Sequence, residues 1–388
     1  MIIKSILDTD LYKLTMGFAV VKNFPYQKVR YKFTDRNNIS FPDNFDKDVM
    51  DEVKNMESLF LTQLEKTWVT RNLGKFLPPT YIDFLSGYRF DSSEVDVYLD
   101  DDNKLHIDIE GFWYRTILWE VPLMAIISEL YFQKTGQIID IFDDNIVLKD
   151  RNKLQKMTEH NAFFADFGTR RRYSFKNQEK IVSLYKDCPI FTGTSNVFLA
   201  HKYNIKCTGT MAHEWFMVHA ALFGYKMSNK LSLDNWVNTY EGSLGIALSD
   251  TYTSDVFFKS FDTKQSKLFD GVRHDSGDPF EFTDKVINHY KSMGIDTMSK
   301  TIIFSDGLDI DLATEIKEYC VGKIKSAFGI GTYLTNDLGV KPLNMVIKIS
   351  EVLVNDDWIP AVKLSDNKGK NTGDKDEVEL CKKILNIR

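Results

Sequence analysis

The second half of the chain repeats one pattern, and this pattern constrains the fold more than any other feature of the sequence. From about residue 163, short apolar segments end in glycine or polar residues and are followed by stretches with helical spacing of apolar residues. The segment ends are 165–170, 190–195, 207–210, 246–250, 272–277, 302–307 and 327–332. Strands and helices that alternate at this spacing predict right-handed crossovers and a parallel sheet.

The number of repeats bears on whether the sheet closes. About seven successive units favour an irregular TIM-like (β/α) barrel. An open, doubly wound sheet is the alternative, but it needs a switch point between two halves, and none is visible in the sequence. We therefore predict an α/β barrel.

The two ends of the chain do not follow this repeated pattern. We expect helices at about 10–23 and 43–71, a strand at 29–33, a hairpin of 95–99 with 105–109, and antiparallel strands at 345–349 and 359–363. The last two strands are expected to rejoin the N-terminal region. This predicts an α+β domain of residues 1–112 completed by 340–388, and a barrel domain of residues 113–339.

Composition and charge exclude several classes of function. A net charge of −6 argues against binding to duplex nucleic acid, because neutralising phosphates needs clustered lysine and arginine. The four cysteines are widely scattered, which indicates neither a zinc ribbon nor a disulfide framework. The apolar run 121–131 is too short to span a bilayer and is interrupted by Glu129. We expect a cytoplasmic protein that binds no membrane.

One histidine lies where an α/β protein places its chemistry. His213 follows the β-branched segment 205–208 and precedes an apolar helical run. Imidazole can exchange protons or accept a group near neutral pH, whereas a structural role is the ordinary alternative for a single histidine. Glu214 suggests the zinc motif H-E-x-x-H, but the fourth residue after His213 is Met217. A zinc site is therefore not expected.

If the barrel forms, the carboxyl ends of all its strands lie on the same side of the barrel. Alone, each polar residue there has a structural explanation, such as a helix cap, a turn or a solvated basic run. Their recurrence at the same point of each unit favours a functional site. The residues are Arg170, Ser195, His213, Asp250, Arg273, Asp275, Asp306 and the turn from Gly329 to Gly331.

These residue types suit a phosphorylated substrate. The turn that ends in Gly331 and Thr332 offers backbone amides to a phosphate, although it is not a Walker A loop. Asp275 and Asp306 could hold ribose hydroxyls, or Mg²⁺ bound with phosphates. Arg170 and Arg273 could clamp an anion. Phe167 could stack on a planar ring, although a core position is the simpler explanation for one phenylalanine.

Six motifs in order resemble the nicotinate phosphoribosyltransferase family, from Asp8 to at least Leu343. They are Asp8-Thr9-Asp10-Leu11-Tyr12-Lys13, Phe167-Gly168-Thr169-Arg170-Arg171-Arg172, Gly193-Thr194-Ser195-Asn196, Thr208-Gly209-Thr210-Met211-Ala212-His213-Glu214, Arg273-His274-Asp275-Ser276-Gly277-Asp278 and Phe328-Gly329-Ile330-Gly331-Thr332. The resemblance implies that nicotinate and phosphoribosyl pyrophosphate give nicotinate mononucleotide and pyrophosphate, in the salvage route to NAD.

The resemblance also implies ATP coupling and roles for single residues. ATP would transiently phosphorylate His213, and Asp250 would orient the imidazole through its far ring nitrogen. Tyr12, supplied by the neighbouring subunit of a homodimer, and Phe167 would sandwich the pyridine ring. Arg170 and Arg273 would hold anionic groups.

The remaining roles concern the phosphoribosyl group and the base. Asp275 and Asp306 would contact the ribose and its Mg²⁺-phosphate environment, and Gly331 with Thr332 would hold the 5′-phosphate. Ser195 bears on the base, because the related nicotinamide phosphoribosyltransferases carry an acidic residue at that point. An acidic side chain there would repel the carboxylate of nicotinate, whereas the hydroxyl of Ser195 can donate a hydrogen bond to it. Ser195 therefore favours the acid over the amide.

Two readings of other classes remain open at this point. A non-catalytic nucleotide-binding regulator could share the fold, although His213, Asp275 and Asp306 disfavour it. A barrel aldolase needs a Schiff-base lysine at a strand end, and none of the segment ends presents one.

Overall fold

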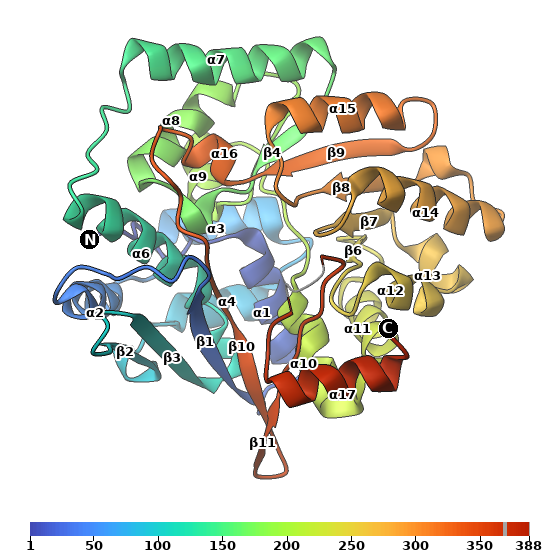
Figure 1. Ribbon diagram of the computed structural model, residues 1–388, viewed down its shortest axis with the longest axis horizontal. Coiled ribbons are helices and arrows are strands. Elements are labelled where there is room, and N and C mark those ends of the chain that lie inside the picture. The colour runs from blue at the N-terminus through green and yellow to red at the C-terminus, as the bar shows by residue number, and fades with distance from the viewer. Residues whose placement is uncertain (368–370, 388) are drawn as a thin grey trace.

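The protein is built around two β-sheets, which the computed structural model describes for residues 1–367 and 371–387 (Figure 1). Helices account for most of the remaining chain. They are α1 (Leu11–Asn23), α2 (Phe45–Met56), α3 (Gln63–Leu73), α4 (Pro79–Gly87), α5 (Trp113–Thr116), α6 (Glu120–Lys134), α7 (Asp144–Glu159), α8 (Phe175–Tyr185), α9 (Val197–Tyr203), α10 (His213–Phe223), α11 (Tyr225–Tyr240), α12 (Ser254–Ser260), α13 (Thr263–Leu268), α14 (Pro279–Ser292), α15 (Ile310–Cys320), α16 (Thr332–Thr335) and α17 (Lys375–Leu385).

The first sheet is the parallel sheet that the repeated pattern predicts. Its neighbouring strands follow the order β5-β4-β9-β8-β7-β6, and every pair in it is parallel. The carboxyl ends of these strands therefore lie along one edge. The strands are β4 (Phe164–Asp166), β5 (Phe191–Thr194), β6 (Ile246–Leu248), β7 (Gly271–His274), β8 (Thr301–Phe304) and β9 (Lys325–Ile330).

The expected closed barrel is not found. The edge strands β5 and β6 do not pair with each other in the described part of the chain, so the sheet stays open. Residues 205–208, which we expected to form a further strand, make only a single parallel bridge from Cys207 to Thr194. The next two elements, α10 and α11, follow each other without an intervening strand. Within residues 1–367 and 371–387, the pairing that would join the two edges is thus missing.

The second sheet is antiparallel and combines both ends of the chain. Its order is β11-β10-β1-β3-β2, with β1 (Lys28–Asp35) at the centre. The outer strands are β2 (Val95–Leu99), β3 (Leu105–Phe112), β10 (Met345–Val354) and β11 (Asp357–Pro360). The predicted hairpin is confirmed as β2 with β3. The C-terminal β10 pairs with β1 along most of its length, in a register that includes Phe33 with Ile347.

One hydrophobic cluster includes residues of both sheets, such as Tyr31 of β1 and Ile302 of β8.

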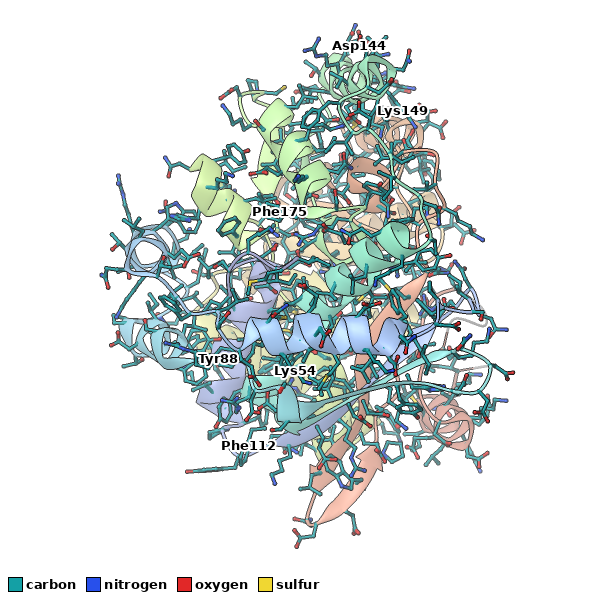
Figure 2. The ribbon with its side chains drawn as sticks, turned by 90° about the vertical axis from the view of Figure 1, so that its left-hand side faces the viewer. Lys54, Tyr88, Phe112, Asp144, Lys149 and Phe175 are labelled. Atoms are coloured by element: carbon teal, nitrogen blue, oxygen red, sulfur yellow. The ribbon has the colours of Figure 1, made fainter. Side chains whose placement is uncertain are left out.

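The domain limits at 112/113 and 339/340 stay predictions. Figure 2 shows α7, with Asp144 and Lys149, at the top of the molecule and Phe112, which ends β3, in its lower part. Among the described residues, no helix combines the length and apolar character needed to cross a bilayer.

The helix expected over residues 43–71 is interrupted. It forms two helices, α2 and α3, because a new N-terminus begins at Thr62. The hydroxyl of Thr62 accepts from the backbone amide of Glu65, while the carboxylate of Glu65 accepts from the amide of Thr62. This reciprocal pair is a capping box, which starts a helix and explains the break.

Candidate active site

A cavity of about 1580 Å³ extends from the carboxyl edge of the parallel sheet. The loops after β4, β5, β7, β8 and β9 all contribute to its lining, because the parallel strands end at the same edge. Ten of the eleven residues predicted from the sequence line it. They are Tyr12, Phe167, Arg170, Ser195, His213, Arg273, Asp275, Asp306, Gly331 and Thr332.

His213 is the first residue of α10, and both nitrogens of its ring make hydrogen bonds. Nε2 lies 2.8 Å from Oδ2 of Asp275, at the end of β7, and Nδ1 lies 3.0 Å from Oγ1 of Thr251. A carboxylate can only accept a hydrogen bond, so Nε2 carries the proton and Nδ1 keeps its lone pair. The hydroxyl of Thr251 therefore donates to Nδ1.

The imidazole of His213 is neutral at physiological pH. Burial, reinforced by the positive charge of Lys363, lowers its pKa to about 4 despite the nearby carboxylates of Asp250 and Asp275. The pKa of Asp275 is held well below its ordinary value, because Arg273 and His213 outweigh the effect of burial. The site thus pairs a neutral, nucleophilic imidazole with an ionised carboxylate.

Asp250 lies near His213 but does not hydrogen-bond to its ring. Its Oδ1 is 3.8 Å from Nε2, and that nitrogen is already bonded to Asp275 at 2.8 Å. Its Oδ2 accepts from Ser276 at 2.6 Å and from Lys363 at 3.3 Å. Asp275 is therefore the residue that orients the imidazole, and Asp250 is a buried anion behind it that balances Lys363.

The three arginines after β4 do not form a solvated basic run. Arg170 lines the cavity and lies 3.4 Å from Oε1 of Glu120. Arg171 also lines the cavity and donates to the carbonyl of Met345. Arg172 is fully buried and forms a two-point ion pair with Asp8. Only the first two face the cavity, because Asp8 fixes the third in the interior.

Tyr12 lines the cavity of its own chain, and the contribution of this residue by a neighbouring subunit stays a prediction. Its ring centre lies 5.9 Å from Cζ of Arg170. The start of α1 is anchored beyond β5, since the amide of Leu11 donates to the carbonyl of Ser195. This contact brings the Tyr12 of the same chain to the cavity.

The hydroxyl of Ser195 is already engaged. It donates to Oδ1 of Asp10 at 2.7 Å, and both residues are buried and line the cavity. Burial raises the pKa of Asp10, although Arg170 and Ser195 oppose the shift. A hydroxyl has one proton, so Ser195 in this arrangement presents lone pairs to the cavity and not the donor that we expected for a substrate carboxylate.

Phe167 lies against β9 because residue 329 has no side chain. A Cβ on Gly329 would come within 2.3 Å of the Phe167 ring. The chain then turns at Gly331 into the short helix α16, which begins at Thr332. The carboxyl end of β9 therefore supports the ring of Phe167 and also provides the predicted phosphate-binding turn.

Sequence reasoning missed the cationic side of the cavity. Arg36, Lys348 and Lys363 line it together with Arg171, and they come from β10 and from the segments that follow β1 and β11. Burial, with the charges of Lys363 and Arg36, lowers the pKa of Lys348 to about 7. A lysine within the apolar run 345–349 was the available signal, because a charged residue in such a strand needs a partner or a ligand.

The residues present fit Mg²⁺ bound together with phosphates. Asp275 and Asp306 follow the neighbouring strands β7 and β8 and both line the cavity. Carboxylate oxygens are the ligands that Mg²⁺ prefers. Asp250, Asp275 and His213 also lie close together, with ligand atoms within 4.8 Å. The hydrogen bonds of His213 to Asp275 and Thr251 account for that cluster.

Two family models match the chain. Residues 7–128 match the N-terminal domain of the nicotinate phosphoribosyltransferase family, and residues 162–388 match the model of the family itself. These matches confirm the resemblance carried by the six motifs.

Individual relatives agree over the full length. The chain is 49% identical to a nicotinate phosphoribosyltransferase of Chromohalobacter salexigens over 384 residues, covering 98% of both chains. It is also 49% identical to that of Desulforapulum autotrophicum, covering 99% of both. The crystal structure of nicotinate phosphoribosyltransferase from Porphyromonas gingivalis superposes with a TM-score of 0.96 at 45% identity, covering 100% of both chains. The chain therefore belongs to the nicotinate phosphoribosyltransferase family.

Proposed function

We propose that this protein transfers the phosphoribosyl group of phosphoribosyl pyrophosphate to nicotinate and so contributes to NAD salvage. The observation that carries the proposal is that one cavity collects aromatic rings, arginines, carboxylates and a neutral histidine from the strand ends of the parallel sheet and from the starts of α1 and α10. In the reaction the bond from C1′ of the ribose to the pyrophosphate oxygen breaks. The bond from C1′ to the pyridine nitrogen forms, and pyrophosphate leaves.

The pyridine ring would bind between the aromatic residues Tyr12 and Phe167. Arg170 and Arg273 line the same cavity and would attract the carboxylate of nicotinate. Nicotinamide is neutral and gains nothing comparable from these two charges. The arginines, more than the hydroxyl of Ser195, therefore favour the acid over the amide.

Phosphoribosyl pyrophosphate would occupy the rest of the cavity. Gly331 and Thr332 would hold its 5′-phosphate through backbone amides, and Asp275 and Asp306 would contact the ribose. The cations Arg36, Arg171 and Lys348 line the same cavity and would neutralise the pyrophosphate group. Mg²⁺, held by Asp275 and Asp306 together with the phosphates, would offset negative charge on the leaving group.

We further propose that ATP phosphorylates His213. Once the hydroxyl of Thr251 turns away, the lone pair on Nδ1 would attack the γ-phosphorus, ADP would leave, and water would later hydrolyse the phosphohistidine. The lowered pKa of His213 supports this role, because a protonated imidazole has no free lone pair. The hydrogen bond from Nε2–H to Asp275 stabilises the charge that the ring acquires during attack.

Two further proposals concern the whole protein. We expect a homodimer with the active site at the subunit interface, and residence in the cytoplasm. Sedimentation of the purified protein tests the first of these.

The substrate assignment is tested by product analysis. The purified protein is incubated with phosphoribosyl pyrophosphate, Mg²⁺ and either nicotinate or nicotinamide, and the mononucleotides are separated. We expect nicotinate mononucleotide and little product from the amide. Product from nicotinamide alone, or no pyrophosphate release with either base, would contradict the proposal.

A further inference from the structure

A buried chain of charges runs behind the cavity and joins three helices. Lys13 of α1 has no exposed surface, and its Nζ lies 2.5 Å from Oε2 of Glu120 on α6 and 3.0 Å from Oε1 of Glu214 on α10. The other carboxylate oxygen of Glu120 lies 3.4 Å from Nη1 of Arg170. A continuous path of ion pairs therefore connects Arg170, which lines the cavity, to Glu214, which is buried behind it.

The sequence positions tie this path to the active site. Lys13 follows Tyr12 in α1, and Glu214 follows His213 at the start of α10. Neither Lys13, Glu120 nor Glu214 lines the cavity. Any influence they have on a substrate must therefore pass through residues that do.

The net charge of this path depends on whether one of its two carboxylates is protonated. With both carboxylates ionised, Lys13 and Arg170 compensate Glu120 and Glu214, and the path is neutral. With one carboxylate protonated, it carries one net positive charge. An anion bound at Arg170 favours the positive form, because it repels a second buried carboxylate.

The environment selects Glu214 as the carboxylate that takes the proton. Burial and the charge of Glu120 raise its pKa to about 7, although Lys13 opposes the shift. Tyr31 on β1 and Tyr12 on α1 also face Glu214, and both stay neutral because burial raises their pKa. The pKa of Glu120 is lowered, because Lys13 and Arg170 outweigh its burial.

We propose that Glu214 is a positioning residue that takes up a proton when an aromatic carboxylate binds at Arg170, and transmits its own ionisation to that site through Lys13 and Glu120. This inference rests on the proposed binding of nicotinate. It makes the affinity for an anionic ring fall as pH rises through neutrality, since ionised Glu214 must then be reprotonated. A neutral ring would show no such dependence.

Two other groups could produce a similar dependence and must be separated from Glu214. Lys348 lines the cavity and loses its charge in the same pH range, and Asp10 is buried 4.0 Å from Nε of Arg170. A dependence caused by either residue would survive the removal of the Glu214 carboxylate. The variant Glu214→Gln distinguishes the cases, because glutamine resembles the protonated acid in shape and cannot ionise.

The test measures the dissociation constants of nicotinate and nicotinamide between pH 6 and 8.5 for the wild-type protein and Glu214→Gln. For the wild type we expect nicotinate to bind up to about tenfold more weakly per pH unit above neutrality. For Glu214→Gln we expect nearly constant affinity, and for nicotinamide no dependence in either protein. The matched control is Glu129→Gln, a change on α6 at a carboxylate that accepts from the amide of Phe175. It should keep the wild-type slope.

The inference would be overturned if the affinity of Glu214→Gln for nicotinate keeps the wild-type pH dependence. It would also be overturned if that dependence disappears only in Lys348→Met. If Glu214→Gln does not fold, calorimetry of the wild-type protein in two buffers of different ionisation enthalpy still decides. Proton uptake should accompany nicotinate and not nicotinamide, and its absence would refute the coupling. Failure of the proposed function is a separate result, because it would appear as no product from nicotinate at any pH.

Discussion

His213 shows how far a single residue can be interpreted from sequence. Its position before an apolar helix marked it as a candidate, but its protonation state depends on residues distant in the chain. Thr251, Asp275 and Lys363 set its ring orientation and its pKa, and their proximity follows only from the folded sheet. The same applies to Asp250, since the hydrogen bond expected from its carboxylate to the imidazole is instead made by Asp275.

The lowered pKa of His213 gives a prediction about pH. The folded protein binds this proton less readily than an unfolded chain does, so neutral His213 favours the folded state above about pH 6.5, and this contribution falls towards pH 4. The imidazole therefore stays nucleophilic at pH 6. We expect the initial rate of ³²P transfer from ATP to change less than about twofold between pH 7.5 and 6. A transfer rate that falls between pH 7.5 and 6 as expected for an imidazole of ordinary pKa would contradict the lowered pKa of His213.

Ser195 gives a second prediction at this scale. Ser195→Asp would place a carboxylate beside the buried carboxyl of Asp10, close to the proposed base pocket. We expect the KM for nicotinate to rise at least about tenfold and that for phosphoribosyl pyrophosphate to change less than about threefold. Ser195→Ala is the control, since it removes the hydrogen bond without adding charge. Equal effects on both substrates would remove Ser195 from the base pocket.

At the scale of elements, the sequence predicted what local patterns determine. The strands of the parallel sheet, the hairpin of β2 with β3, and α1 follow from alternation and helical spacing. The break between α2 and α3 was missed although its capping box, Thr62 with Glu65, is visible in the sequence. Closure of the sheet could not be predicted in the same way, because it depends on whether 205–208 pairs along its length.

The contact between β9 and Phe167 leads to a prediction about an element. Gly329→Ala would push a methyl group into the ring of Phe167 and displace it from the strand. We expect the KM for nicotinate to rise by about tenfold, on the order of 1.4 kcal/mol, with a smaller effect on phosphoribosyl pyrophosphate. The control is Gly87→Ala at the end of α4, where an added Cβ meets nothing within 4 Å. Unchanged nicotinate kinetics in Gly329→Ala would show that Phe167 does not contact the base.

At the scale of the whole molecule, the site depends on both ends of the chain. Arg36 and Lys348 reach the cavity because β10 pairs with β1, so chain segments more than 300 residues apart form one wall. Lys363, which follows β11, lines the cavity as well. The sequence predicted that the strands from the two ends of the chain meet, but gave no sign that Lys348 and Lys363 face the strand ends of the other sheet. That information lies in how the two sheets are positioned around the cavity.

This wall gives a prediction about the leaving group. Lys348→Met should raise the KM for phosphoribosyl pyrophosphate by about tenfold or more, since it removes a cation from the proposed pyrophosphate region. Lys341→Met is the control, because Lys341 also lines the cavity but is exposed at its rim. A Lys348→Met enzyme with unchanged affinity for phosphoribosyl pyrophosphate and pyrophosphate would place the leaving group elsewhere.

The most direct test of the account is to measure nicotinate mononucleotide formation and ATP hydrolysis together, in the wild-type protein and in His213→Ala. We predict that the wild-type protein hydrolyses ATP as it forms product and carries an acid-labile phosphate. His213→Ala should form product slowly, without ATP hydrolysis and without labelling. Undiminished labelling or ATP coupling in His213→Ala would contradict the assignment of His213, and no product from nicotinate in the wild-type protein would contradict the account as a whole.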